Sequence, residues 1–170
     1  MQAAGICSPT GELLTAAGRG PMRPLPCDTV YVIENETTYL AFPAVERAVA
    51  LFGGGYAVSV LEQLHWLDDR EIVYWGDIDT HGFAILDRLR RRFPRTHSLL
   101  MDRATLLTHD GQWVREDSPH VSHLQHLRPD EAELYRDLVE DMLGPSIRLE
   151  QERIWYPAIR HAIERRASRR

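Results

Sequence analysis

The sequence contains no lysine, and all 20 of its basic residues are arginine. Such a complete absence is typical of a biased coding composition. Cysteine is scarce too: Cys7 and Cys27 are the only two, and they lack CxxC spacing, which excludes a disulfide scaffold and favours free thiols in a reducing compartment. No apolar run approaches the roughly 18 residues of a membrane span, and the N-terminus lacks the pattern of a secretory signal. We therefore expect a cytoplasmic protein with no membrane contact.

The charge balance of the chain is mildly acidic. It has 170 residues, and 25 acidic against 20 basic residues give a formal net charge of −5. This excludes a protein that simply coats nucleic acid. The arginines are nevertheless clustered, and the planar guanidinium suits phosphate, so local binding of a polyanion is possible. The two clusters are Arg88, Arg90, Arg91, Arg92 and Arg95, and then Arg160, Arg165, Arg166, Arg169 and Arg170.

Strand and helix patterns alternate through the middle of the chain. Residues 29–33 are a continuous apolar, β-branched run, as expected for a strand that is buried on both faces. This alternation predicts an α/β fold, with a parallel sheet of about four strands flanked by helices and a helical C-terminal extension. The other predicted strands are 56–60, 71–75 and 96–101; the predicted helices are 37–52, 61–67, 82–93, 129 to about 143, and a last one from Ile147.

The two ends of the chain have a different composition from the middle. Residues 1–28 are rich in Gly, Pro and small side chains, and we interpret them as a linker or the tail of a preceding domain. The predicted domain is 29–157, and 158–170 form a basic C-terminal tail. A His-rich stretch within the domain lies next to Pro119 and lacks neighbouring acids, which favours a surface segment over a metal site; it holds His120, His123 and His126.

Three acidic residues follow predicted strands. Glu34 comes after the first strand, and Asp77 and Asp79 come after 71–75. Because the carboxyl ends of parallel strands share one edge of a sheet, the three carboxylates should converge there. Like charges at close range are costly without a cation, and ligation by oxygen alone suits Mg²⁺ or Mn²⁺. Any one of these acids could instead be an ordinary helix N-cap, and Asn35 could either fix Glu34 or cap the next helix.

A Glu at the end of one strand, with Asp-x-Asp ending a later one and a Gly opening a helix, resembles the Toprim domain. Three segments are most similar to the C-terminal domain of the JetD family. These proteins are nuclease subunits of the bacterial Wadjet anti-plasmid system and are related to the type VI topoisomerases. The resemblance covers roughly residues 27–155. Its segments are Val32-Ile-Glu-Asn-Glu-Thr-Thr-Tyr-Leu40, Tyr74-Trp-Gly-Asp-Ile-Asp-Thr-His-Gly-Phe83 and Arg148-Leu-Glu-Gln-Glu152.

The resemblance implies a divalent-metal-dependent DNA endonuclease with Mg²⁺ or Mn²⁺ bound by Glu34, Asp77 and Asp79. Glu150 and Glu152 lie two apart in a predicted helix, so at most one faces the cleft, and we prefer Glu152. His81 could orient water or contact phosphate, or simply stand in the first turn of its helix. The partners implied are double-stranded plasmid DNA, the SMC-like subunits of the Wadjet complex and a second copy in a homodimer.

DNA contacts are expected from the arginine clusters. Residues 88 and 92 share one helix face, and the C-terminal arginines should contribute at least as much. The predicted DNA-binding residues are Arg160, Arg165, Arg166, Arg88 and Arg92.

Two alternative functions stay open. A phosphatase of the haloacid dehalogenase type also ends a strand in Asp-x-Asp, but it needs Thr or Val where His81 stands. A Toprim scaffold without catalysis would only dock DNA or a partner.

Overall fold

The computed structural model describes residues 5–7, 13–15, 26–54 and 61–168. Its main sheet has the strand order β2-β1-β4-β3-β5-β6. The four strands β4, β3, β5 and β6 are parallel, with β1 and β2 added antiparallel at the β4 edge. The bounds are β1 Gly5–Cys7, β2 Leu13–Thr15, β3 Thr29–Ile33, β4 Ala48–Phe52, β5 Glu71–Trp75 and β6 His97–Ser98; a separate antiparallel pair joins β7 Val114–Arg115 to β8 Ile147–Arg148.

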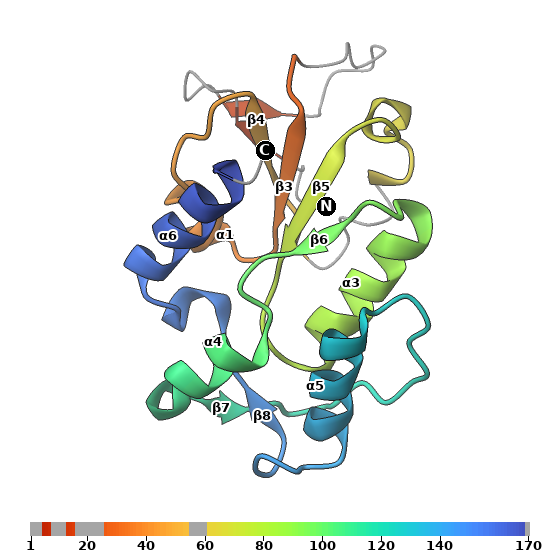
Figure 1. Ribbon diagram of the computed structural model, residues 1–170, viewed down its shortest axis with the longest axis vertical. Helices are drawn as coiled ribbons and strands as arrows, with labels where there is room; N and C mark the ends of the chain where they lie inside the picture. Colours follow the sequence, from red (N-terminus) through yellow and green to blue (C-terminus); the bar gives the residue numbers. More distant parts are fainter. Residues whose placement is uncertain (1–4, 8–12, 16–25, 55–60, 169–170) are drawn as a thin grey trace.

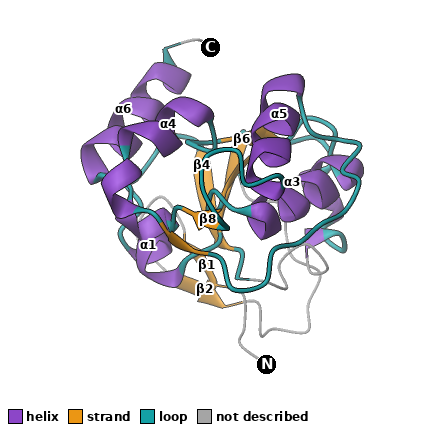
Figure 2. Cartoon of the chain, turned by 90° about the horizontal axis from the view of Figure 1, so that it is seen from below, coloured by secondary structure: helices purple, strands orange, loops and turns teal. Residues whose placement is uncertain are grey.

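Helices cover both faces of the sheet (Figures 1 and 2). Helices α1 (Glu36–Leu40), α4 (Arg103–Thr108) and α6 (Tyr156–Ala167) lie on one side, and α3 (Thr80–Arg92) and α5 (Pro129–Val139) on the other. Short 3₁₀ turns are η1 (His65–Leu67), η2 (Asp110–Gln112) and η3 (Gln151–Arg153). The core is built around the two central strands, where Tyr74, Trp75 and Ile33 are fully buried, and around Phe83 of α3. The predicted α/β fold, four parallel strands flanked by helices, is confirmed.

The helix predicted over 37–52 is wrong. Helix α1 ends at Leu40, and Ala48–Phe52 forms β4, which pairs in parallel with β3 from Thr29↔Ala48 onward. Pro43 lacks the N–H that a continuing helix would need. A short apolar run such as Ala-Val-Ala-Leu-Phe fits a buried strand as well as a helix, and the open edge of β3 decides in favour of the strand.

The helix predicted from Ile147 is also wrong, because this segment pairs as a strand. Ile147–Arg148 form β8, and Leu149 then exchanges two backbone hydrogen bonds with Ile78, at 2.9 and 3.1 Å. The helix begins only at Tyr156. Helix α6 takes in most of the predicted basic tail and buries its apolar face, so residues 158–167 are part of the packed domain.

Smaller differences concern element ends. Within residues 1–28, interpreted as a linker, β1 and β2 extend the sheet, because the edge of β4 offers backbone groups for pairing. The strand predicted at 56–60 lies outside the described residues. Of the predicted helix 61–67, the 3₁₀ turn 65–67 is described, and of the predicted strand 96–101, the pair 97–98 is a strand.

Candidate active site

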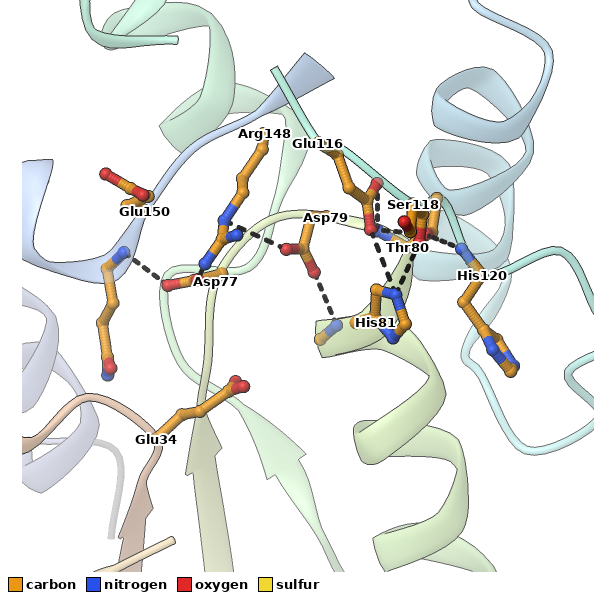
Figure 3. A network of polar contacts seen from close by, with 12 residues as sticks. Glu34, Asp77, Asp79, Thr80, His81, Glu116, Ser118, His120, Arg148 and Glu150 are labelled. Atoms are coloured by element: carbon orange, nitrogen blue, oxygen red, sulfur yellow. Dashed lines mark hydrogen bonds and ion pairs between the residues drawn. The ribbon is translucent and has the colours of Figure 1, made fainter. Parts of the chain in front are cut away.

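Glu34, Asp77 and Asp79 lie at the carboxyl edge of the two central strands (Figure 3). Strands β3 and β5 pair in register as far as Ile33↔Trp75, and the Glu34 N–H then donates to the Trp75 carbonyl at 3.1 Å. Glu34 leaves the end of β3, while the two aspartates follow β5. The parallel sheet thus places at one edge the three acids that the sequence pointed to.

The Glu34 carboxylate is held by its neighbour on β5. The Tyr74 hydroxyl donates to Glu34 Oε2 at 2.8 Å. Burial raises the pKa of Glu34; the Tyr74 hydrogen bond opposes this rise and the negative charge of Asp77 adds to it. A Cβ on Gly76 would come within 2.2 Å of the Tyr74 hydroxyl and 2.5 Å of Glu34 Oε2, so glycine is required for this contact.

Asp77 is fixed by the segment that follows β8. Its Oδ1 accepts the Gln151 N–H at 2.7 Å, and its Oδ2 accepts from Arg148 Nη2 at 2.5 Å. The buried Gln151 side chain also donates to the Trp75 carbonyl at 2.9 Å and accepts the Asn35 N–H at 2.8 Å. Gln151 therefore ties together the ends of β3 and β5 and the first aspartate of the pair.

Asp79 is the N-cap of α3. Its Oδ1 accepts the Gly82 N–H at 2.7 Å, and its Oδ2 lies 3.3 Å from Arg148 Nε. Burial raises the pKa of Asp79 to about 7, against the effect of the Gly82 hydrogen bond and with the negative charges of Glu116 and Asp77 adding to the rise. A Cβ on Gly82 would lie 2.2 Å from the Asp77 carbonyl oxygen, so the helix can start this close to the acids only at a glycine.

A fourth carboxylate, Glu116, lies behind Asp79 and was not foreseen. It is buried, and it accepts hydrogen bonds from the Thr80 hydroxyl at 2.6 Å and the Thr80 N–H at 3.3 Å. His81 Nε2 lies 3.9 Å from Glu116 and 2.7 Å from the Ser118 carbonyl oxygen. Because a carbonyl only accepts, His81 Nε2 carries a proton, and the His81 ring is oriented by this irregular segment (Figure 3).

The two glutamates of the Arg-Leu-Glu-Gln-Glu segment do not join the aspartate pair. Glu152 accepts from the Asn35 side-chain amide, and Asn35 in turn caps α1 by accepting the Thr38 N–H at 2.9 Å. Glu150 pairs with Arg153 at 2.7 Å. The residues of this segment that contact Asp77 are its arginine and its glutamine. The predicted helix is replaced here by the short strand β8, which ends at Arg148, and by the 3₁₀ turn η3, which starts at Gln151.

Comparison with known protein families settles the relationship of the chain. A family model described as "Wadjet protein JetD, C-terminal" matches residues 14–163. The chain belongs to this family. The membership confirms the resemblance to JetD and places the chain among components of the Wadjet anti-plasmid system. A search of curated proteins gave no match.

Two of the arginines predicted to bind DNA, Arg92 and Arg166, lie near the start of β5, at the end opposite the aspartates of this JetD-family chain. Arg88 and Arg92, in the second half of α3, pair with Glu62 at 3.7 Å and Asp68 at 2.7 Å. In α6, Arg160 pairs with Glu164, Arg166 pairs with Glu71, and Arg165 is their neighbour. Glu71 is the first residue of β5, whereas Asp77 and Asp79 follow its last. A further cluster member, Arg90, is buried against Glu131 at 2.5 Å.

The donor set suits a hard divalent cation in its chemistry, since it offers buried carboxylate oxygens whose charges repel. In the described part of the chain, no three His, Cys, Asp or Glu side chains are grouped so as to hold a metal ion. The guanidinium of Arg148 lies against both aspartates instead. Its Nε is buried and has no hydrogen-bond partner, so this cation satisfies the pair incompletely. The oxygen donors of Glu34, Asp77 and Asp79 suit the metal that the family resemblance implies in their chemistry, but with Arg148 between the aspartates their side chains are not grouped around a common point.

Membrane insertion has no support in the described ranges: every helix there is too short or too polar to cross a bilayer.

Proposed function

We propose that the chain is the catalytic region of a divalent-metal-dependent DNA endonuclease, which hydrolyses phosphodiester bonds of plasmid DNA in Wadjet defence. One observation supports this most strongly. In a JetD-family chain, Glu34, Asp77 and Asp79 all lie at the carboxyl edge of a parallel sheet, where α/β proteins bind ligands. Burial raises the pKa of Glu34 and of Asp79, as is typical of carboxylates in functional sites.

In this proposal, Glu34, Asp77 and Asp79 hold Mg²⁺ or Mn²⁺. Such an ion, when bound, supplies positive charge against the scissile phosphate and lowers the pKa of bound water. Tyr74 orients Glu34, and Gln151 orients Asp77 through its backbone N–H.

His81 is proposed to act on water or phosphate beside the acids. Its Nε2–H donates a hydrogen bond to the Ser118 carbonyl oxygen. In this tautomer of the neutral ring, Nδ1 carries the lone pair and can accept a hydrogen bond or a proton from water. Glu116 keeps Thr80, the residue before His81, in place by accepting both its hydroxyl and its N–H. Glu152 is assigned to holding Asn35 next to Glu34.

The proposed partners are double-stranded plasmid DNA and the SMC-like Wadjet subunits, and the proposed location is the cytoplasm. Two copies of the chain in a homodimer would cut both DNA strands. The proposed DNA contacts remain Arg160, Arg165, Arg166, Arg88 and Arg92. Because Arg92 and Arg166 lie at the other end of β5 from the aspartates, they would bind DNA that extends beyond the cleavage point.

The test is cleavage of supercoiled plasmid by the full Wadjet complex with Mn²⁺ or Mg²⁺, comparing the wild-type chain with Asp79→Asn. We expect nicked or linear DNA from the wild type and none from the variant or with chelator. Equal cleavage by both would contradict the proposal. DNA binding without cleavage under every metal condition would favour the docking module, which the contact of Arg148 with Asp77 and Asp79 also fits. Hydrolysis of a small phosphomonoester would favour the phosphatase.

A further inference from the structure

Arg148 occupies the position between the two aspartates that a cation would need. Its Nη2 donates to Asp77 Oδ2 at 2.5 Å, and its Nε lies 3.3 Å from Asp79 Oδ2. The guanidinium therefore covers the oxygens that are not already used by the N–H groups of Gln151 and Gly82. While Arg148 stays in this position, a metal ion bound to both aspartates would lie against the guanidinium, and the repulsion between the two positive charges would oppose its binding.

The contact of Arg148 with the two aspartates leaves part of the guanidinium without a hydrogen bond, so another cation can replace it. The Nε of Arg148 is buried without a hydrogen-bond acceptor, although a carboxylate is nearby. The contrast with Arg90 is clear: its guanidinium is bidentate with Glu131 and bonds two carbonyl oxygens as well. A guanidinium gains most from the paired, fork-like contact that Arg90 makes and Arg148 does not.

The backbone at Arg148 is fixed while its side chain reaches the surface. The N–H and the carbonyl of Leu149 both form hydrogen bonds with the backbone of Ile78, and β8 is paired with β7. The Arg148 side chain is 36% exposed, against 5% for Asp79. Arg148 can thus leave the aspartates by rotation of its side chain, without moving β8.

We propose that Arg148 is an internal counter-cation, which a divalent metal ion displaces from Asp77 and Asp79 when it binds. The arginine stabilises the charged carboxylates in the metal-free chain, and it lowers the affinity of the site for metal. Because metal must break the Asp77 ion pair, the affinity of the chain for metal is lower than its carboxylates alone would give. This inference rests on the proposed function, since it takes the two aspartates as metal ligands.

The first experiment is calorimetric titration of Mn²⁺ into the wild-type chain, Arg148→Gln and Arg153→Gln. Arg153 is the matched control: it is a half-exposed arginine of the same segment, paired with Glu150, and its loss changes the net charge equally. We expect Arg148→Gln to lower the Mn²⁺ Kd by about tenfold, equal to about 1.4 kcal/mol, with Arg153→Gln close to wild type. An unchanged or higher Kd in Arg148→Gln overturns the inference and leaves the metal site standing. Absence of Mn²⁺ binding in wild type and Arg148→Gln alike contradicts the proposed function as well.

A second experiment needs no variant, in case Arg148→Gln does not fold. The Nε–Hε signals of the arginine side chains are followed by NMR during a Mg²⁺ titration of the wild-type chain. We expect the Arg148 signal to shift and saturate with metal while the Arg90 signal, buried against Glu131, stays in place. A static Arg148 signal at saturating Mg²⁺ overturns the displacement.

Discussion

The Tyr74 hydroxyl donates a hydrogen bond of 2.8 Å to the Glu34 carboxylate, across neighbouring parallel strands. Tyr74 is fully buried on β5, and Glu34 stands just beyond the end of β3. The bond limits the rise in the pKa of Glu34 that burial causes, so it helps keep this carboxylate charged. A side chain of the core, Tyr74, therefore influences the protonation of a site residue, Glu34.

Tyr74→Phe should weaken metal binding without unfolding the chain. It removes the hydroxyl from a buried carboxylate, which should cost about 1.5–3 kcal/mol of unfolding free energy and raise the pKa of Glu34 further. Calorimetry with Mn²⁺ should show a higher Kd, and urea denaturation should show the lost stability. Tyr135→Phe is the matched control, because its hydroxyl donates to the backbone at His120 and Ser122. A Kd for Tyr74→Phe equal to that of the control would contradict the role given to Tyr74.

Asp79→Asn should make the metal-free chain more stable at alkaline pH. The pKa of Asp79 rises from 3.8 to about 7 on folding, so between these values the native state holds a proton that the unfolded state has lost. Stability therefore falls as pH rises through this window, by up to about 4 kcal/mol from this group. Asn keeps the N-cap of α3 but carries no charge. Urea denaturation at pH 5 and pH 8 should show a smaller pH effect in Asp79→Asn than in wild type.

The control for this pH experiment is Asp102→Asn. Asp102 is the N-cap of α4, where its Oδ1 accepts the Thr105 N–H at 2.8 Å, and it is exposed. We expect this variant to keep the wild-type pH dependence. If Asp79→Asn also kept the wild-type pH dependence of stability, a group other than Asp79 would be its source. Asp79→Ala should be less stable than Asp79→Asn by about 1 kcal/mol, because it also removes the cap.

Gly76→Ala should damage the site through packing. The added Cβ would meet the Tyr74 hydroxyl at 2.2 Å and Glu34 at 2.5 Å, so one of them must move. We expect a loss of about 1–3 kcal/mol in unfolding free energy and loss of DNA cleavage. Gly111→Ala is the control, since a Cβ there meets nothing within 4 Å. Wild-type cleavage by Gly76→Ala would show that the Glu34–Tyr74 contact is dispensable.

The joint replacement of Arg160, Arg165 and Arg166 by Ala should weaken DNA binding and flatten its salt dependence. Each lost phosphate contact should lower the slope of log affinity against log salt by about 1. Fluorescence anisotropy with a DNA duplex at several salt concentrations measures this slope. A variant of equal charge change serves as the control: Arg47→Ala, Arg103→Ala and Arg136→Ala combined. An equal slope in both triple variants would assign the α6 arginines to ion pairs such as Arg166–Glu71.

The sequence was sufficient to predict the two central strands, β3 and β5, and the three acids that follow them. Glu34, Asp77 and Asp79 each follow an apolar run of strand length, and the alternation with helices implies parallel strands with a common edge. The error at Ala48–Phe52 arose because a five-residue apolar run has no periodicity that separates strand from helix.

The rest of the site depends on contacts that no local pattern encodes. Glu116 comes from an irregular segment, and only the fold brings it to Thr80. Arg148 and Gln151 stand 71 and 74 positions from Asp77. The Arg-Leu-Glu-Gln-Glu segment was recognised from the sequence as part of the site. Which of its side chains contact Asp77 depends on the bridge between Leu149 and Ile78 and on the 3₁₀ turn that follows.

The central claim is a divalent metal site at the three acids, and the most direct measurement is anomalous diffraction from crystals of the chain soaked in Mn²⁺. The account predicts one strong peak between Glu34, Asp77 and Asp79, with carboxylate oxygens at roughly 2.0–2.2 Å or joined through one water, and with Arg148 turned away. A peak at other residues, no peak at saturating Mn²⁺, or carboxylates that diverge by more than about 10 Å would contradict it.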